Sequence, residues 1–293
     1  MAGNLVRTKR RIASISSTKK ITKAMEMVAS VKLKRFKSAF ERLRDYENEL
    51  KEQMSYLVHL LNEQWAEEGK CPTHYIKENE SAEGTLYLLI TSDLGLCAGY
   101  NSNLFKYLEE HIDKEKDTLA PIGQKGLTHY LREGGYRVDP SFGEIGLSLD
   151  IVLVFERCAK IKAEFNEERY KRVVLIYTEY RNSISFVPNS LDLLPLSLPY
   201  EEKDYRKTSP ELLIDTPRNM LHQILPQYLY GILYARLVES QLSEQASRRN
   251  AMENANDNAD ELLRTLSIEY NKARQSAITQ EIVEVVSGSA NAS

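Results

Sequence analysis

The chain is poor in the residues that form disulfides and metal sites. Three cysteines occur among its 293 residues, and their odd number and scattered positions indicate free thiols in a reducing compartment. The five histidines form no pair at metal-ligand spacing, so we expect neither a zinc site nor any other metal or cofactor. The cysteines are Cys71, Cys97 and Cys158.

Long apolar runs are missing as well. No window of about 18 apolar residues occurs, so no segment is expected to cross a membrane. The chain starts with MAGNLVRTKRR, which lacks the apolar core of a secretory signal. Although this start is basic, like a transit peptide, a heptad pattern continues from it past Leu61, which indicates folded structure.

Glycine and proline are absent from two long stretches, Asn4 to Glu68 and Ile232 to Ser287. Inside a helix glycine costs about 1 kcal/mol and proline about 3 kcal/mol, so their absence predicts helix. At about 1.5 Å per residue the helices would reach about 95 Å and about 85 Å. Such helices need a partner for their apolar stripes. We expect them to pair with each other; the alternative is two independent amphipathic helices.

The first stretch carries a heptad seam. Alternating steps of three and four residues pass through 17 positions, of which 12 are apolar, and this period is typical of a left-handed coiled coil. The seam fails between Lys19 and Glu26, so we expect that segment to face something other than its coiled-coil partner. The positions are Leu5, Thr8, Ile12, Ile15, Lys19, Thr22, Glu26, Ala29, Leu33, Phe36, Phe40, Leu43, Glu47, Leu50, Met54, Leu57 and Leu61.

The second stretch carries a less regular seam. Two successive steps of four residues predict a stutter, which locally unwinds a supercoil. The many alanines would allow close approach of the two helices. The positions are Ala255, Ala259, Leu262, Leu266, Tyr270, Ala273 and Ala277.

The net charge of −3 is unevenly distributed along the chain. Residues 1–44 hold 13 Lys and Arg against two acids, whereas residues 211–293 hold 11 acids against 7 bases. Opposite charges favour pairing of the two helices and suit an acidic partner near the first one. Nucleic acid is an alternative partner, but we expect none, because no aromatic residues interleave the basic run and no recognition motif occurs.

Strand-like and helix-like segments alternate between the two long helices, which predicts a small Rossmann-like α/β domain. The expected strands are TLYLLIT (Thr85 to Thr91), LAPIG, KRVVLIYTEY and ISFVP. The expected helices are one capped by Asn101 or Asn103 and ending near His111, one at QKGLTHYLREGG, and one from Leu149 to Phe165. The predicted parts are an N-terminal coiled-coil helix (1–68), the α/β domain (69–209) and a C-terminal coiled-coil helix (210–293).

The turn SDLGLCAGYN, residues 92–101, lies between a strand and a helix, where a phosphate-binding turn would sit. The G-x-G-x-x-G spacing and the P-loop lysine are absent, so a tight-turn role for Gly95 and Gly99 is favoured over nucleotide binding. No base stands beside Asp93 or Cys97 in the sequence, so we expect no catalytic site on this chain.

Two further segments carry a specific resemblance. They are KITKAMEMVASVKLKR, from Lys20 to Arg35, and NADELLRTLSIEYNKARQSAITQEIVEVVSG, from Asn258 to Gly288. Together with SDLGLCAGYN, in matching order and spacing along nearly the whole chain, they resemble the gamma subunit of F-type ATP synthase. The patterns I-T-x-A-M-x-M-V and N-K-x-R-Q-x-x-I-T-x-E are highly specific.

The resemblance implies a central-stalk rotor: an antiparallel coiled coil of the terminal helices beside an α/β domain. The expected partners are the alpha and beta subunits around the C-terminal tip, and the epsilon subunit and membrane c-ring at the foot. Membrane association would be indirect, and the expected location is the cytoplasmic face of a bacterial cell membrane. The alternatives are a coiled-coil adaptor of another assembly and a nucleotide-binding α/β enzyme.

The resemblance also assigns residues. Lys20, Lys23 and Met25 match positions that face the acidic lever of beta, and Arg274, Gln275 and Thr279 match the catch positions. The bearing tip contains Ile278, Ile282, Val285 and Val286, and the foot region contains Asp93, Gly95, Cys97 and Asn101. The chain departs from the family at Leu94, where arginine or lysine is usual, and at Ala98, where glycine is usual.

Overall fold

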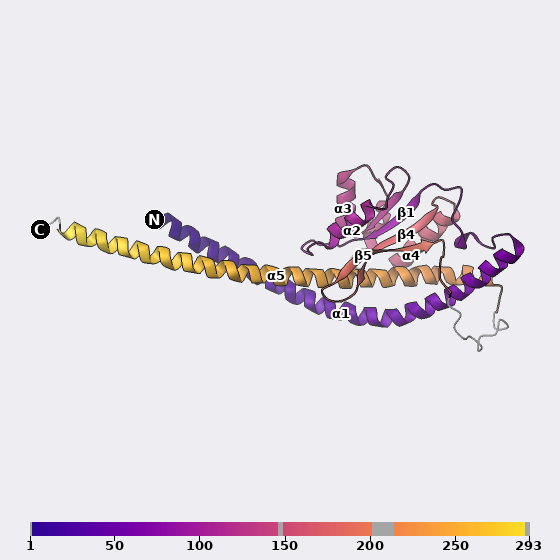
Figure 1. Cartoon of the computed structure of the whole chain (residues 1–293), viewed down its shortest axis with the longest axis horizontal. Helices are drawn as coiled ribbons and strands as arrows, with labels where there is room; N and C mark the ends of the chain where they lie inside the picture. Colours follow the sequence, from indigo (N-terminus) through magenta and orange to yellow (C-terminus); the bar gives the residue numbers. More distant parts are fainter. Residues whose placement is uncertain (1, 146–148, 201–213, 291–293) are drawn as a thin grey trace. The chain divides into compact units, whose positions relative to one another are not determined.

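The computed structural model describes residues 2–145, 149–200 and 214–290, without the side chains of residues 2–4, 281, 284 and 286–290. The chain forms two compact units (Figure 1). Unit 1 contains residues 1–31 and 248–293, and unit 2 contains residues 32–247. This division cuts both long helices, whereas the three parts predicted from sequence follow element ends.

Two long helices and a five-stranded sheet account for most of the described residues, which confirms the predicted fold class. The helices are α1 (Ala2–Glu68), α2 (Tyr100–Glu109), α3 (Gln124–Glu133), α4 (Ile151–Asn166) and α5 (Pro217–Ala290). The strands are β1 (Thr85–Ile90), β2 (Thr118–Ile122), β3 (Arg137–Val138), β4 (Arg172–Tyr180) and β5 (Phe186–Leu194). Two short 3-10 helices are η1 (His74–Ile76) and η2 (Pro140–Ile145).

The sheet of unit 2 has the strand order β3-β2-β1-β4-β5 and is parallel except for β5. Side chains of β1 alternate between two cores, as a strand covered on both faces requires. Leu88 packs in the core that includes residues of α4, α1 and α5, and Leu89 packs in the core that includes residues of α2 and α3. The result is a three-layer α/β domain of the doubly wound type.

Helix α5 begins at Pro217, inside the predicted C-terminal part (210–293) and before the glycine- and proline-free stretch that starts at Ile232. The segment before Ile232 contains Pro226 and Gly231, which are helix-breaking residues by propensity. Packing explains why the helix continues: a Cβ on Gly231 would lie 2.9 Å from Leu50 Cδ2, so glycine permits close approach to α1. Tertiary contact therefore overrides propensity over this segment.

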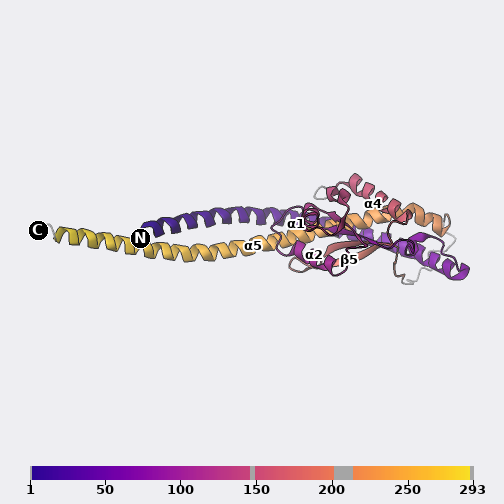
Figure 2. The ribbon, with the colours of Figure 1, turned by 90° about the horizontal axis from the view of Figure 1, so that it is seen from above.

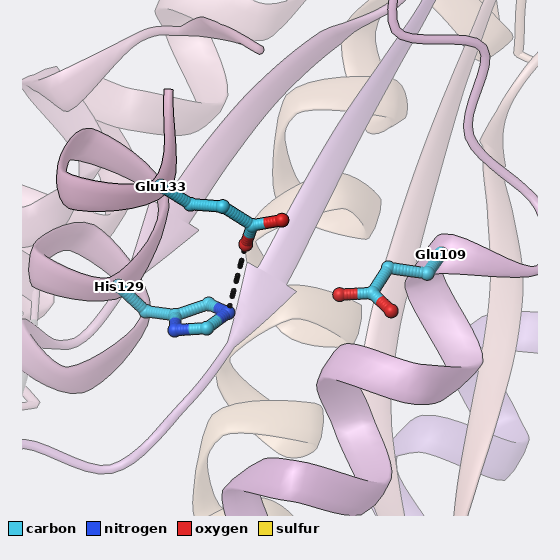
Figure 3. A group of neighbouring side chains, drawn as sticks. All are labelled: Glu109, His129 and Glu133. Carbon is cyan, nitrogen blue, oxygen red and sulfur yellow. Dashed lines mark ion pairs between the residues drawn. The ribbon is translucent and has the colours of Figure 1, made fainter. Parts of the chain in front are cut away.

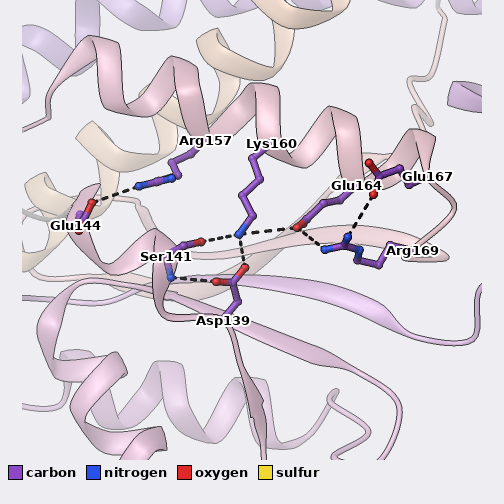
Figure 4. A network of polar contacts seen from close by, with 8 residues as sticks. All are labelled: Asp139, Ser141, Glu144, Arg157, Lys160, Glu164, Glu167 and Arg169. Atoms are coloured by element: carbon purple, nitrogen blue, oxygen red, sulfur yellow. Dashed lines mark hydrogen bonds and ion pairs between the residues drawn. The ribbon is translucent and has the colours of Figure 1, made fainter.

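A polar network ties α4 to the segment around β3 and η2 (Figure 4). The Lys160 ammonium donates to Asp139 Oδ2 and to Ser141 Oγ, each at 2.6 Å. Burial opposes ionisation of Asp139, but the hydrogen bonds from Lys160 and Ser141, together with the charge of Lys160, outweigh burial and lower the pKa of that carboxyl. Arg169 extends the network by donating to Glu164 Oε1 at 2.9 Å. The network fixes the position of α4 beside the sheet edge.

A buried charge cluster lies between α1 and α5 within unit 2. Arg236 on α5 is ion-paired with both Glu47 on α1 and Glu239 on α5. Its guanidinium also lies 5.1 Å from the ring centre of Tyr177 on β4. Lys51 is a second, half-exposed partner of Glu47, at 2.5 Å. Arg236 therefore connects both long helices to the sheet.

None of the described helices combines the length and apolar character that a membrane span requires.

Candidate partner-contact surfaces

The two helices of unit 1 run antiparallel, because contacts made by later residues of α1 reach earlier residues of α5 (Figures 1 and 2). Lys19 pairs with Asp260 at 2.5 Å, whereas Glu26 accepts a hydrogen bond from Asn256 at 2.6 Å. Every predicted seam position of α1 within this unit is buried or half-buried. The seam predicted for α1 is therefore correct in register.

The seam of unit 1 contains a polar layer where a gap was predicted. Thr22 donates to Asn256 Oδ1 at 2.5 Å, and Asn256 also donates to Glu26. The hydrogen bond from Lys23 has the largest effect on Glu26 and lowers its pKa. Burial opposes this, and the hydrogen bond from Asn256 adds to the lowering, so the carboxylate stays charged in the layer. We expected the segment from Lys19 to Glu26 to face something other than its coiled-coil partner. For Thr22 and Glu26 this is wrong, because both contact Asn256 of α5. A polar seam position of this kind fixes helix register.

The seam of α5 is regular, so the predicted stutter is wrong. Leu262 is 49% exposed, whereas Leu263 is half-buried and Asn256 is buried. The predicted seam contains Ala255 and Leu262 because an apolar pattern does not include the polar Asn256. With the observed residues, the steps alternate strictly between four and three. The observed seam is Met252, Asn256, Ala259, Leu263, Leu266, Tyr270, Ala273 and Ala277.

The opposite side of α1 carries an exposed apolar surface, here called the outer face. At about 100° per residue its members lie on one side of the helix, facing away from the seam. Sequence reasoning missed this surface, although the spacing of 3, 4 and 3 residues between Ile21, Ala24, Val28 and Val31 could have revealed it. The outer face contains Ile21, Ala24, Met27, Val28 and Val31, with the four large side chains 57–73% exposed.

The lever residues assigned from the resemblance lie beside the outer face. Lys20 and Lys23 are exposed, and Met25 is half-buried. Lys23 pairs with Glu26 at 3.0 Å. By helical position Lys20 lies within the outer face, Lys23 at one of its edges and Met25 at the other edge. The three side chains thus lie around a shared apolar surface and not at one point.

The tip residues form a single exposed strip at the C-terminal end of α5. Helical spacing places the predicted tip and catch positions within an arc of about 140°, on the side away from the seam. Thr279 donates to the Gln275 carbonyl at 2.9 Å, inside the helix. The side chain of Val286 lies outside the described residues. The exposed members are Arg274, Gln275, Ile278, Thr279, Ile282 and Val285.

The foot residues in the turn after β1 hold that turn to neighbouring elements. Asp93 Oδ1 accepts a hydrogen bond from the backbone N–H of Gln124 at 2.7 Å, at the start of α3. Asn101 accepts from the Ser92 N–H at 3.1 Å and donates to the Ser92 hydroxyl at 2.7 Å. Helix α2 begins after Gly99 without a side-chain cap, so the predicted capping role of Asn101 or Asn103 is wrong. Asn101 instead closes the turn.

The remaining foot residues lie in the same turn. Cys97 is buried, and its carbonyl accepts a hydrogen bond from the Ser247 hydroxyl at 2.7 Å. A Cβ on Gly95 would meet only the end of the Lys125 side chain, at 3.7 Å, so space does not demand glycine there. Leu94 is 57% exposed, which places an apolar side chain at the surface where the resemblance implies a cation. These positions build the turn and expose Leu94.

Helix α5 fills the crevice in which a doubly wound sheet would bind a ligand. Such crevices lie outside the carboxyl ends of adjacent strands, here β1 and β4. Ser240 accepts from the Thr178 N–H at 3.4 Å, and Ser243 donates to the Thr178 carbonyl at 3.3 Å. The remaining cavity beside Thr91 and Glu244 measures about 10 Å³, which is room for about one water. A nucleotide has no space there.

Ala98 stands in a left-handed backbone conformation, with φ of 46°. An L residue there costs roughly 1–2 kcal/mol, and glycine, the residue that the resemblance implies at this position, does not have this cost. We expect Ala98→Gly to raise the free energy of unfolding by up to about 1 kcal/mol, part of the gain being offset by the entropy of glycine. Urea unfolding of the full chain measures this.

A matched substitution separates this effect from glycine in general. Ala159 is exposed in the interior of α4, and Ala159→Gly is expected to lower the free energy of unfolding by about 1 kcal/mol. Equal losses in both variants would contradict the account of Ala98.

Comparisons with known proteins give a consistent result. The protein family described as ATP synthase matches residues 4–292. The chain is 33% identical to the "ATP synthase gamma chain" of Ruminiclostridium cellulolyticum, over 98% of each protein. It is 34% identical to the "ATP synthase gamma chain, sodium ion specific" of Acetobacterium woodii, again over 98% of each.

Solved structures share the fold. A chain of the Euglena gracilis mitochondrial ATP synthase rotor superposes with a TM-score of 0.64 at 20% identity, covering 95% of this chain and 100% of the other. A chain from the central stalk and c-ring of Tetrahymena thermophila mitochondrial ATP synthase gives a TM-score of 0.56 at 25% identity. That match covers 80% of this chain and 99% of the other.

Proposed function

The chain belongs to the gamma-subunit family of F-type ATP synthases, the central-stalk rotor, and from this we propose how its surfaces transmit rotation. The tip strip turns inside the ring of alpha and beta subunits, and the foot rests on epsilon and the c-ring. Rotation then passes through the paired helices. The comparisons lend no support to the alternative of a coiled-coil adaptor in another assembly.

The observation that carries the proposal is the exposure of large apolar side chains at the end of α5. Ile278, Ile282 and Val285 are 48%, 58% and 67% exposed, although nearby seam residues such as Leu266 are buried. Exposed apolar side chains gathered on one helix side indicate a partner surface. A bearing suits them, because apolar contacts are non-directional and do not resist rotation at one angle.

Polar residues on the same strip supply directional contacts. Arg274 is exposed and carries a fixed charge, so it can make a charge-assisted bond with an acceptor on one beta subunit at a time. Gln275 and Thr279 lie beside it on the exposed arc. We assign these three residues to the catch. A mixed strip of this kind combines low friction with preferred stopping positions.

We assign the second drive contact to the outer face of α1 with its flanking lysines. Its apolar side chains would bury against the beta lever, and Lys20 and Lys23 would attract the acids of that lever. The excess of basic residues in 1–44 supports this contact between α1 and an acidic lever. Met25 contributes at the edge of the same surface.

A cation at Met25 tests the lever contact. Met25→Lys adds a charge beside Lys20 and Lys23, and a half-exposed ion pair with an acidic lever contributes about 0.5–1 kcal/mol. This stronger attraction holds the rotor against the lever and should lower the ratio of ions pumped to ATP hydrolysed by about twofold. The measurement is ATPase activity and ion pumping of the assembled complex in membrane vesicles.

The neutral substitution Met25→Leu keeps the size and apolar character and should leave the ratio unchanged. A wild-type ratio in Met25→Lys, with normal assembly, would show that this residue does not face the lever.

We further propose that the chain has no catalytic site of its own. The filled crevice at β1 and β4 supports this, because the position used for nucleotides in related sheets is occupied by Ser240 and Ser243. The nucleotide sites belong to the alpha and beta subunits. The chain acts peripherally at the cytoplasmic face of a bacterial membrane, held there through the complex.

A further inference from the structure

Three side chains of the kinds that bind metals converge from two helices of the α/β domain (Figure 3). Glu109 is the last residue of α2, whereas His129 and Glu133 lie four residues apart on α3. Their ligating atoms all lie within 4.8 Å of one another. His129 Nε2 and Glu133 Oε2 are 3.2 Å apart. In Figure 3 the Glu109 carboxylate points toward the other two side chains.

The spacing is close to that of a tetrahedral metal site. Zinc binds imidazole nitrogen and carboxylate oxygen at about 2.0–2.2 Å, which places two ligand atoms about 3.4 Å apart. The pair formed by His129 and Glu133 already has this separation. Glu109 is exposed at a helix end, so rotation of its side chain alone can close the remaining distance.

The ring of His129 is held in place for this role. The Phe105 ring stacks on it with centroids 4.2 Å apart and planes 2° from parallel. The Tyr130 ring packs edge-on at 4.8 Å. These contacts fix the ring plane and keep Nε2 directed at Glu133. A preformed ligand direction lowers the entropic cost of binding an ion.

A second observation comes from the Tyr130 hydroxyl. Tyr130 is 1% exposed, and its hydroxyl has no hydrogen-bond partner among the described residues. The Tyr130 ring packs edge-on against the His129 ring, so this tyrosine lies directly beside the cluster. A buried unsatisfied donor requires an explanation. An outer-sphere bond to a metal-bound water or ligand oxygen supplies one.

A simple ion pair explains less of this arrangement. The pair of His129 and Glu133 at i and i+4 is common on helix surfaces. Lys114 lies 4.0 Å from Glu133 and is the cation that would compete with a metal. Lys114 also attracts the Glu109 carboxylate, but neither contact supplies a partner for the Tyr130 hydroxyl.

We propose that Glu109, His129 and Glu133 form a binding site for a zinc-class divalent cation, with a fourth position open to water. Mixed imidazole and carboxylate ligands suit zinc better than magnesium. The bound ion ties the end of α2 to α3 across the core of that face. The site could not be predicted from histidine spacing, because it contains a single histidine and its ligands come from two helices.

The test is zinc chloride titrated into the full-length chain, in competition with a chromogenic chelator. Cys71→Ser serves as background, because Cys71 is the partly exposed thiol. We expect one zinc per chain, bound about tenfold or more weakly in His129→Gln and in Glu109→Gln. His111→Gln and Glu110→Gln are matched controls close to Glu109, and they should bind as the background does.

Zinc should also raise the thermal midpoint of the background and of both controls, but not that of the two ligand variants. Millimolar magnesium should not displace it. Absence of stoichiometric binding, unchanged affinity in Glu109→Gln, an equal loss in the controls, or displacement by magnesium would each overturn the proposal. Circular dichroism of every variant identifies any loss of affinity caused by unfolding.

Discussion

Removing residues 278–293 should lower ion-coupled turnover of the assembled complex by about tenfold or more while leaving the α/β domain folded. The deleted segment includes the exposed apolar side chains of Ile278, Ile282 and Val285. Full burial of one such side chain is worth about 1.5–3 kcal/mol. Even partial burial of three in a bearing exceeds the 1.4 kcal/mol that corresponds to tenfold.

The deletion should spare the fold because it begins beyond the observed seam. The seam of α5 ends at Ala277, and the described side chains after it are exposed. Unit 2 ends at residue 247. The thermal unfolding of the α/β domain in the truncated chain should therefore match that of the full chain.

A shorter truncation provides the control. Removing only residues 288–293 keeps Ile278, Ile282 and Val285 and should have a smaller effect on turnover. ATPase activity and ion pumping of reassembled complexes measure both variants. Wild-type coupling and turnover in the longer truncation would show that the tip takes no part in driving rotation.

The largest effect on stability is expected at Arg236. Arg236→Ala leaves Glu239 and Glu47, both buried, with one cation fewer. Breaking a buried ion pair in this way costs about 3–5 kcal/mol, a large part of the 5–15 kcal/mol that stabilises a typical domain. The loss of the contact with Tyr177 adds to it. Urea unfolding at pH 7 measures the change.

The loss of unfolding free energy caused by Arg236→Ala should become smaller as the pH falls. Burial raises the pKa of Glu239 even with Arg236 present, whereas Arg236 and Lys51 outweigh burial and lower the pKa of Glu47. A carboxyl with a raised folded pKa binds a proton on folding, so stability falls as the pH rises through its titration. Without Arg236 the pKa of Glu239 rises further. The stability lost in Arg236→Ala should therefore be greatest at neutral pH and smaller near pH 5.

Lys51→Ala is the matched control for Arg236→Ala. It removes the half-exposed partner of Glu47 and should cost less than about 1 kcal/mol. Combining Arg236→Met with Glu47→Gln and Glu239→Gln removes the whole charge cluster and should restore most of the stability. Equal losses for Arg236→Ala and Lys51→Ala would contradict the role given to the buried cluster.

The sequence predicted helix pairing well because apolar periodicity reports directly on burial. All 17 predicted seam positions of α1 are buried or half-buried, including the polar Lys19 and Glu47. The partners of those polar residues could not be predicted, since Asp260 and Arg236 come from the far end of the chain. The polar partners of Asn256, Thr22 and Glu26, also lie on the other helix. An apolar pattern therefore omits Asn256 from the seam of α5 and predicts a stutter there.

Features that depend on tertiary contact were less predictable. Helix α5 runs through Pro226 and Gly231, and the close approach of Gly231 to Leu50 is a tertiary contact that no local pattern contains. Asn101 has a capping residue's chemistry, yet its side chain bonds to Ser92 across the turn. The outer face of α1 could have been found from its spacing. Which partner covers it, and which residues of the tip strip act in the catch, stay predictions.

The most direct test of the rotor assignment is to purify the ATPase from native membranes through a tag on its beta subunit and quantify this chain by mass spectrometry. Membership of the gamma family predicts one copy of the chain per three beta subunits in every fraction that couples ATP hydrolysis to ion pumping. A coupled ATPase that lacks the chain, or contains it at much lower abundance, would contradict its assignment as the central stalk.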